Sequence, residues 1–203
     1  MVFDHCPVPT RSPWGPIQHA EQLAPGIWQA GTAGHGGIKL SRQRNAAMPD
    51  FMRIKGGWYE EDSLWARVAI VFRDEPCFQK EAKGTGRTHY DFAEETIRHW
   101  DPEVYEQFFS VQLTPETSRR RAEQAFKADT FDKFVVRSAW GSWSKFVPPG
   151  MVGVAAHRAS DDMERWFLVQ ADEYGARTDF GFVIDPAQHR EVEAPSAEMR
   201  GSR

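Results

Sequence analysis

Two glycine-flanked stretches in the first third of the chain hold the residues best suited to chemistry. The first is Gly34-His35-Gly36-Gly37. Because glycines carry no side chains, a histidine on such a turn can approach a ligand closely, and imidazole titrates near neutrality, which suits an acid, a base or a ligand. The alternative interpretation is a tight turn in which His35 is simply exposed or bonds a carbonyl.

The second stretch places two aromatic rings and three carboxylates directly after a pair of glycines. Its residues are Gly56, Gly57, Trp58, Tyr59, Glu60, Glu61 and Asp62. Such a set can bind a cation or orient a sugar or a nucleotide. In a helix, however, three successive side chains spread over about 200°, and acidic residues in a first turn also complement the helix dipole without any ligand.

His35 and one of these carboxylates would meet if residues 41–54 fold back as a helical hairpin. A histidine that faces a carboxylate forms an acid–base pair or part of a metal site, as a small hydrolase or transferase would need. The candidate catalytic residues are therefore His35, Glu60 and Glu61, with Asp62 as a further carboxylate. On this hypothesis, His35 lies within hydrogen-bond reach of one of the carboxylates in a concave pocket.

The chain also contains eight tryptophans, a large number for 203 residues. Most are expected in an aromatic core, but exposed ones would offer a protein-binding surface. Combined with the glycine turn, they define the candidate binding residues, which are Gly34, His35, Gly36, Gly37, Trp58, Tyr59, Trp140 and Trp143.

The charge balance argues against a general nucleic-acid binder. Lys and Arg number 25 and Asp and Glu 29, so the formal net charge is -4. This value excludes a broad basic surface for duplex DNA. A local patch stays open as a third hypothesis, because several cations follow closely in the sequence: Lys39, Arg42, Arg44, Arg53 and Lys55.

Other classes are excluded by missing patterns. Cys6 and Cys77 are expected as free thiols, and without CxxC or HExxH spacing we predict neither a metal site nor a cofactor. The first residues show no signal-peptide pattern, and the longest nearly apolar stretch, 151–156, is far shorter than the ~20 residues that span a bilayer. We therefore expect a soluble, cytoplasmic protein that does not enter a membrane.

The elements that position these residues follow from their local patterns. Five prolines in the first 25 residues predict an extended arm over residues 1–24, with Trp14 anchoring it. A strand is predicted over 26–32, a turn over 33–37, and a helix from its cap Ser41 to Met48.

Helices are predicted in the middle of the chain. Residues 58–72 fit both a helix and a strand, and their apolar spacing favours the helix. Thr88 is expected to cap a helix that ends at Trp100, Asp101 and Pro102 to begin the next, and Thr114 to begin a third that ends near Lys127.

The last third changes to short β-type runs at 134–140, 151–157, 166–170 and 180–184. Strands with short links form an antiparallel meander. Together these patterns predict a single α+β domain over residues 25–192, in which helices from the first two-thirds pack on a C-terminal meander. The polar tail, 193–203, is expected to be disordered.

Four stretches resemble an uncharacterised bacterial family, the domain of unknown function numbered seven thousand and seven. They are residues 35–45, 56–62, 147–153 and 180–186, and the resemblance spans about residues 12–191. It implies a small accessory protein of proteobacterial plasmids, integrated elements or phages. The family has no assigned chemistry, so no catalytic residue is carried over from it.

Three functions remain open from the sequence. The first is a binding module that modulates a host or element protein, such as a component of a defence system. The second is the small enzyme centred on His35 and a carboxylate, and the third is the nucleic-acid binder. The first is favoured because aromatic residues are abundant and a recognised catalytic signature is missing.

Overall fold

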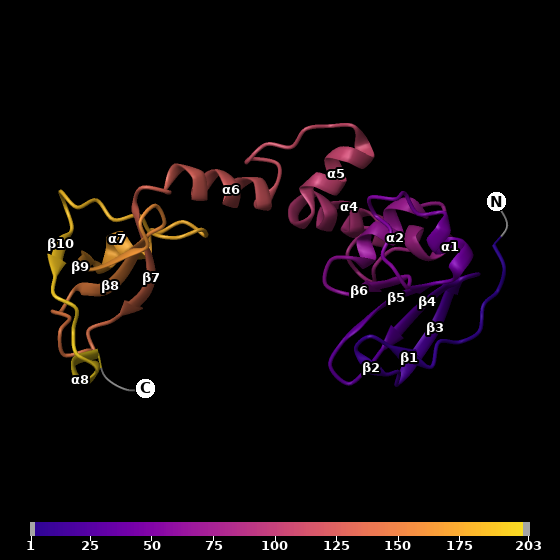
Figure 1. The fold of residues 1–203 in the computed structure, drawn as a ribbon, viewed down its shortest axis with the longest axis horizontal. Coiled ribbons are helices and arrows are strands. Elements are labelled where there is room, and N and C mark those ends of the chain that lie inside the picture. The colour runs from indigo at the N-terminus through magenta and orange to yellow at the C-terminus, as the bar shows by residue number, and fades with distance from the viewer. Residues whose placement is uncertain (1–2, 201–203) are drawn as a thin grey trace. The chain divides into compact units, whose positions relative to one another are not determined.

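The computed structural model describes residues 3–200 and divides the chain into two compact units, unit 1 (Met1–Ala122) and unit 2 (Glu123–Arg203). Each unit contains an antiparallel four-stranded sheet with its own hydrophobic cluster (Figure 1). The α+β class is thus confirmed. The expectation of one core over 25–192 is corrected, because the helices have a sheet of their own in unit 1.

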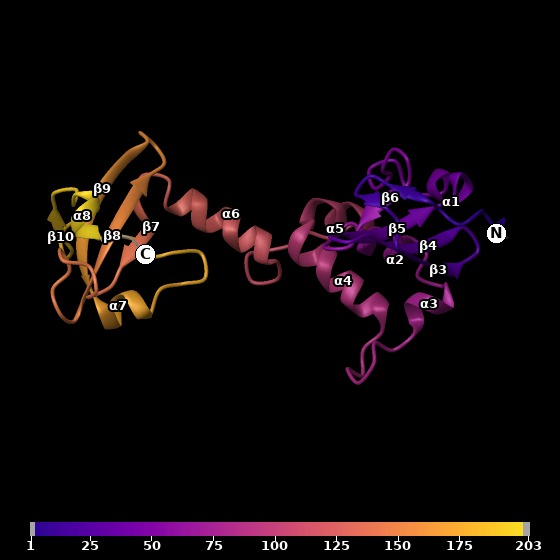
Figure 2. The same cartoon turned by 90° about the horizontal axis from the view of Figure 1, so that it is seen from below.

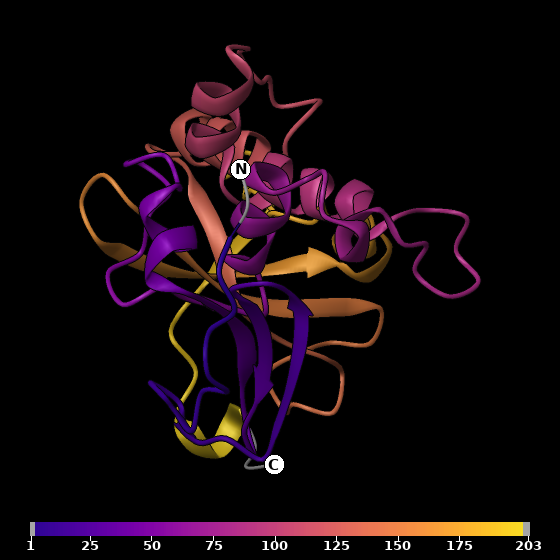
Figure 3. The same ribbon diagram turned by 90° about the vertical axis from the view of Figure 1, so that its right-hand side faces the viewer.

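The sheet of unit 1 has the strand order β3-β4-β5-β6, and its strands lie side by side in Figure 3. The strands are β3 (His19–Ala24), β4 (Ile27–Gly31), β5 (Gly36–Leu40) and β6 (Trp58–Glu60). The predicted arm over 1–24 is therefore wrong in part. Residues 19–24 contain no proline, so their amides can pair with β4 and form the edge of the sheet.

The segment before this edge strand follows the prediction more closely. It contains only the two-residue strands β1 (Arg11–Ser12) and β2 (Gly15–Pro16). Trp14 anchors it as expected, because its ring packs edge-on against Trp58 with centroids 5.6 Å apart. Met1 and Val2 lie outside the described residues.

The turn predicted over 33–37 is shorter in the structure, because Gly36 and Gly37 already belong to β5. They pair with Gly31 and Ala30 of β4. A side chain at position 37 would collide with the backbone of Tyr59 and lie 2.6 Å from the Trp14 ring. Glycine is needed here because β6 and Trp14 approach the strand so closely.

The helices of unit 1 largely follow their predicted signals (Figure 2). They are α1 (Arg42–Ala46), α2 (Trp65–Val71), α3 (Pro76–Gln79), α4 (His89–Trp100) and α5 (Pro102–Phe109). Ser41 caps α1, and Thr88 forms a capping box with Asp91 at the start of α4. The stretch 58–72, which fitted both a helix and a strand, contains both. Residues 58–60 form strand β6, and the helix occupies only residues 65–71.

Helix α6 (Arg119–Asp129) begins later than the predicted start at Thr114. The amide of Thr114 is held by the hydroxyl of Thr117, and residues 114–117 form a turn instead. Helix α6 contains the boundary between the two units.

Unit 2 contains the predicted meander, in the order β10-β9-β8-β7. Its strands are β7 (Phe134–Trp140), β8 (Met151–Arg158), β9 (Met163–Gln170) and β10 (Arg190–Val192), and α7 (Ala171–Gly175) follows β9. The fourth strand is thus β10 and not the run 180–184. That run makes isolated bridges only, and Gly181 within it has a φ of 142°, outside the range of a regular strand.

The tail is more ordered than predicted. Residues 197–200 form α8 (Ala197–Arg200), and the Ser144 hydroxyl donates a hydrogen bond of 2.7 Å to the Met199 carbonyl. The disorder predicted over 193–203 is therefore wrong for residues 193–200, and residues 201–203 lie outside the described part. Within residues 3–200, no helix combines the length and apolar character that crossing a bilayer requires.

A buried cation joins the helical layer of unit 1 to its sheet. The Arg44 side chain, on α1, is 2% exposed, and its guanidinium contacts Glu75 at 2.6 Å and donates to the Pro25 carbonyl. The rings of Phe3 and Phe72 pack against the same guanidinium. Arg44 thus connects the β3–β4 turn, the end of α2 and the start of α3.

Replacing Glu75 with glutamine should destabilise unit 1 by about 2 kcal/mol, because it leaves a buried positive charge without its counter-ion. The cost stays below the ~3–5 kcal/mol of a fully buried pair, since 23% of the Glu75 side chain is exposed. Asp74→Asn is the matched control, because 97% of the Asp74 side chain is exposed. Urea unfolding, monitored by amide hydrogen exchange in unit 1, measures the stability of both variants. Equal stability of the two would contradict this role of Glu75.

Candidate functional site

Strand pairing brings the two glycine-flanked motifs together. Strands β5 and β6 are antiparallel neighbours in which Gly37 lies opposite Glu60. The Glu61 amide continues the ladder and donates to the Gly36 carbonyl at 3.1 Å. The expected proximity of the motifs is confirmed, although the connecting segment contains only the short helix α1 before it returns to the sheet.

His35 and Glu61 form the closest pair among the predicted catalytic residues. The His35 Nδ1 lies 3.4 Å from the Glu61 Oε1, and about half of each side chain is exposed. Glycine at position 36 makes room for this carboxylate, because a Cβ there would collide with the Glu61 side chain. The pair therefore depends on the glycine that the sequence places beside His35.

Glu60 has a different role. Its carboxylate accepts hydrogen bonds from the amides of Asp62 and Ser63, and it thereby closes the turn that leads to α2. Glu60 is therefore held by its own loop, and the structure pairs Glu61 rather than Glu60 with His35.

Tyr59 is not available to a ligand, which corrects its place among the binding residues. Its side chain is fully buried in the core of unit 1. The hydroxyl donates to the Asn45 Oδ1 at 2.8 Å and accepts from the Ile54 amide. Burial raises the pKa of Tyr59 above its ordinary value, so the phenol stays protonated and holds this loop in place.

The other predicted binding residues are distributed over both units. Gly34 and His35 are exposed at the β4–β5 turn, and Trp58 is half-buried under Trp14 and beside the Lys39 ammonium. In unit 2, Trp140 packs against Trp166 with ring centroids 4.9 Å apart, whereas 56% of Trp143 is exposed. Among the predicted binding tryptophans, only Trp143 is therefore more than half exposed.

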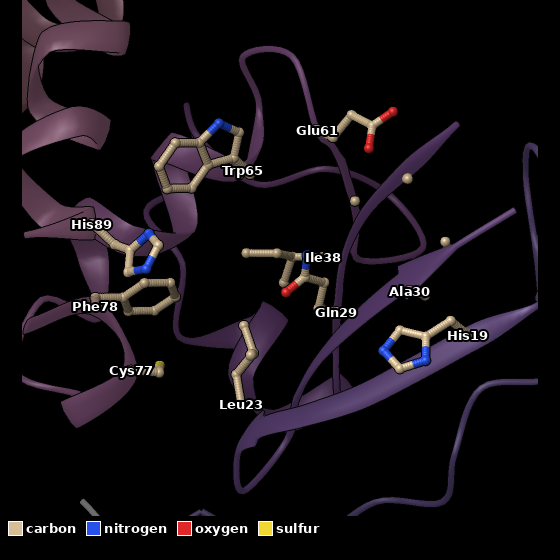
Figure 4. Close-up of a pocket in the computed structure, with 13 residues that line it drawn as sticks. His19, Leu23, Gln29, Ala30, Ile38, Glu61, Trp65, Cys77, Phe78 and His89 are labelled. Carbon is tan, nitrogen blue, oxygen red and sulfur yellow. The ribbon is translucent and has the colours of Figure 1, made fainter. Parts of the chain in front are cut away.

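A pocket of about 350 Å³ lies between the sheet of unit 1 and helices α2, α3 and α4 (Figure 4). Its size suits a small-molecule ligand. It is lined by His19, Leu23, Gln29, Ala30, Gly31, Gly36, Gly37, Ile38, Glu61, Trp65, Cys77, Phe78 and His89.

The pocket has an apolar base and a polar rim. Ile38 and Phe78 are buried, whereas His19, Gln29 and His89 are exposed around the opening. In Figure 4, Trp65, Phe78 and His89 lie on the helical side, across from Gln29 and His19 on the sheet.

Most residues of this pocket belong to no local sequence motif, because they come from strands and helices separated by up to seventy positions. Gly36, Gly37 and Glu61 are the exception, because they belong to the two glycine-flanked motifs. His35 is not among the lining residues, which corrects its expected place in a concave pocket. The other signal in the sequence is the row of three small residues from Ala30 to Thr32, with Gly31 at its centre, which leaves part of β4 without large side chains.

Cys77 is an apolar part of this wall rather than a nucleophile. Burial raises the pKa of the Cys77 thiol, and the neighbouring carboxylate of Glu75 raises it further. Because only the thiolate is nucleophilic, the protonated thiol packs like a small hydrophobic side chain at neutral pH.

The structure does not gather the five cations of the nucleic-acid hypothesis into one exposed patch. Arg44 is buried, and Arg53 donates to the carbonyls of Asn45, Ala46 and Met48. Lys39 donates to the Gly56 carbonyl. Three of the five thus bond groups of the fold itself, although Arg53 is exposed, as are Arg42 and Lys55.

Within residues 3–200, no three His, Cys, Asp or Glu side chains meet in the manner of a metal site.

Unit 1 is an α+β domain whose sheet and helices form a pocket large enough for a ligand. A family model matches residues 7–131, more than half of the chain, and the chain belongs to that family, which is described as a domain of unknown function (DUF7007). No curated protein and no solved structure shows a match to the chain.

The match contains two of the four stretches that resemble the family, residues 35–45 and 56–62. The stretches 147–153 and 180–186 lie beyond it. The family domain therefore covers the sheet, the helices and the pocket of unit 1, and the meander β7–β10 lies outside it.

The raised pKa of Cys77 predicts slow alkylation. In Cys6→Ser protein, iodoacetamide should modify Cys77 more slowly than free cysteine at pH 8, and the rate should rise only as the pH approaches the raised pKa. Mass spectrometry of the intact chain measures the reaction. Alkylation at neutral pH as fast as that of free cysteine would contradict the assigned burial.

Proposed function

We propose that the protein is a binding module that modulates a protein of its host or of a mobile element, such as a component of a defence system. The observation that supports this most directly is the exposed Trp143 of unit 2. Tryptophan is enriched among the residues that dominate binding energy at protein interfaces, yet it is costly to leave in water. The mobile-element setting comes from the family resemblance.

Trp143 is held in place by its loop. The Ser144 amide donates to the Gly141 carbonyl, and the Val147 amide donates to the Ser144 carbonyl. The hydroxyl of the buried Ser144 and the Lys145 amide both bond the Met199 carbonyl, which brings Met199, 41% exposed, to the same loop. A tryptophan on a loop whose backbone is already held loses less conformational entropy on binding, which favours its use as an anchor.

A second observation supports the enzyme as an alternative. Glu61 lines the pocket of unit 1, and its carboxylate lies 3.4 Å from His35. A carboxylate beside one imidazole nitrogen can orient the ring and stabilise its protonated form, which leaves the other nitrogen to act as a general base toward water or a hydroxyl group. The reaction class would be hydrolysis or group transfer.

Trp143→Ala should weaken partner binding by about 30-fold or more, the effect of losing a dominant interface residue. The partner is first captured from native-host lysate on the immobilised full chain, identified, purified and then titrated against each variant. Trp100→Ala is the matched control, because Trp100 is 54% exposed but lies on α4 of unit 1. Binding that survives Trp143→Ala unchanged, or the absence of any protein retained by the wild type, would contradict the proposal.

The enzyme alternative predicts that His35→Gln lowers the turnover of any hydrolytic or transfer activity by about 10²–10⁴-fold. Glu61→Gln should lower it as well, since the imidazole loses its orienting carboxylate. Glu60→Gln is the control, because the Glu60 carboxylate bonds only its own turn among the interactions seen here. A screen of ester, phosphoester and nucleotide substrates supplies the activity, and insensitivity to His35→Gln would exclude this mechanism.

A further inference from the structure

The pocket of unit 1 contains a glycine that neither the backbone nor the packing requires. Gly31, the last residue of β4, has a backbone conformation that other residues can adopt, and a Cβ built on it meets no heavy atom within 4 Å. Glycine in a strand costs roughly 0.5–1 kcal/mol relative to alanine. Such a position often marks the place where a ligand approaches the backbone.

The bare area extends across two strands. Gly31 pairs directly with Gly36, and side chains alternate along a strand, so both glycines share the sheet face that carries Gln29 and Ile38. Open space over Gly31 therefore lies beside the Gln29 amide, while the Glu61 carboxylate occupies the space over Gly36. A flat molecule can rest on this part of the sheet.

The opposite wall suits an aromatic ring. Trp65 from α2 and Phe78 from α3 face the sheet across the pocket (Figure 4). Aromatic side chains stack well on planar heterocycles. The Gln29 amide presents one donor group and one acceptor, the pair that matches the edge of a nucleobase.

The charges of the pocket disfavour a phosphate. Of the residues that line it, none is Lys or Arg, and Glu61 adds a carboxylate at the opening. Helix α4 starts at His89, but the His89 amide donates to the Lys80 carbonyl, and the amides of Thr88 and Asp91 are used in the capping box. Free amides at a helix start would otherwise attract an anion.

We propose that this pocket binds an uncharged or cationic planar heterocycle, of the nucleobase or nucleoside class, between the glycine-bare face of β4–β5 and the aromatic wall of α2–α3. The volume of about 350 Å³ lies at the lower end of the range for small-molecule sites, as expected for a ligand of one or two rings with a sugar. The site belongs to unit 1 and is independent of the Trp143 surface.

Isothermal titration of the full chain with adenosine, guanosine, cytidine and uridine tests the proposal, with their 5′-monophosphates as charged counterparts. At least one nucleoside should bind with a sub-millimolar Kd, and its monophosphate should bind about tenfold more weakly or worse, because Glu61 repels the phosphate. Failure of all four nucleosides, or tighter binding of the monophosphates, would overturn it.

Two substitutions locate the binding. Gly31→Val fills the space over β4 with a β-branched side chain, and should abolish binding while the melting temperature stays equal or rises. Gly175→Val is the matched control, because this glycine of α7 also has open space around it but lies in unit 2, outside the pocket. Equal affinity of Gly31→Val and Gly175→Val would overturn the site.

Gln29→Leu gives a second readout that does not depend on tolerance at Gly31. Gln29 is exposed, so the substitution should leave the fold intact. It should weaken the bound nucleoside by about tenfold or more through the loss of the amide contacts. Retention of full affinity by Gln29→Leu would exclude the proposed orientation, and partner capture through Trp143 should be unchanged in all three variants.

Discussion

The buried guanidinium of Arg44 is the interaction on which the arrangement of unit 1 depends. It neutralises Glu75 at the start of α3, bonds the Pro25 carbonyl at the β3–β4 turn and packs against Phe72 at the end of α2. A charge buried away from water needs a counter-ion and hydrogen-bond acceptors inside the protein. The segments that supply them to Arg44 therefore cannot move apart independently. Because α2 and α3 carry Trp65, Cys77 and Phe78, the same interaction sets the helical wall of the pocket above the sheet.

Three glycines, which carry no side chains, shape the sheet side of the site. Gly37 lets Trp14 and the backbone of Tyr59 approach β5, and Gly36 leaves room for the Glu61 carboxylate. Gly31 differs from both, since the space above it is empty. Two glycines thus allow close packing, whereas the third keeps a surface open. The proposed ligand would use that open surface, and the proposed partner contact lies in unit 2, outside the residues that match the family.

Local rules account for the parts of the fold that the sequence predicted well. The caps Ser41 and Thr88, the Asp101-Pro102 start of α5 and the run Phe134–Trp140 each depend on neighbours within a few positions. The failures involve pairing over longer distances. His19–Ala24 became an edge strand because β4 offered it partners, and Arg190–Val192 joined β9 in place of the apolar run 180–184. Hydrophobic pattern alone does not distinguish between such partners.

The sequence by itself determined the α+β class, most helix starts, the family of the chain and the residues of the two glycine-flanked motifs. Tertiary structure alone decided which of these meet. It paired His35 with Glu61, and it assigned Glu60 to a turn and Tyr59 to the core. It also buried Arg44, one of the candidates for a basic patch. It also assembled the pocket from residues between His19 and His89. The physical reason is that caps and turns are satisfied by adjacent backbone groups, whereas burial and side-chain pairing depend on strand register and packing between distant segments.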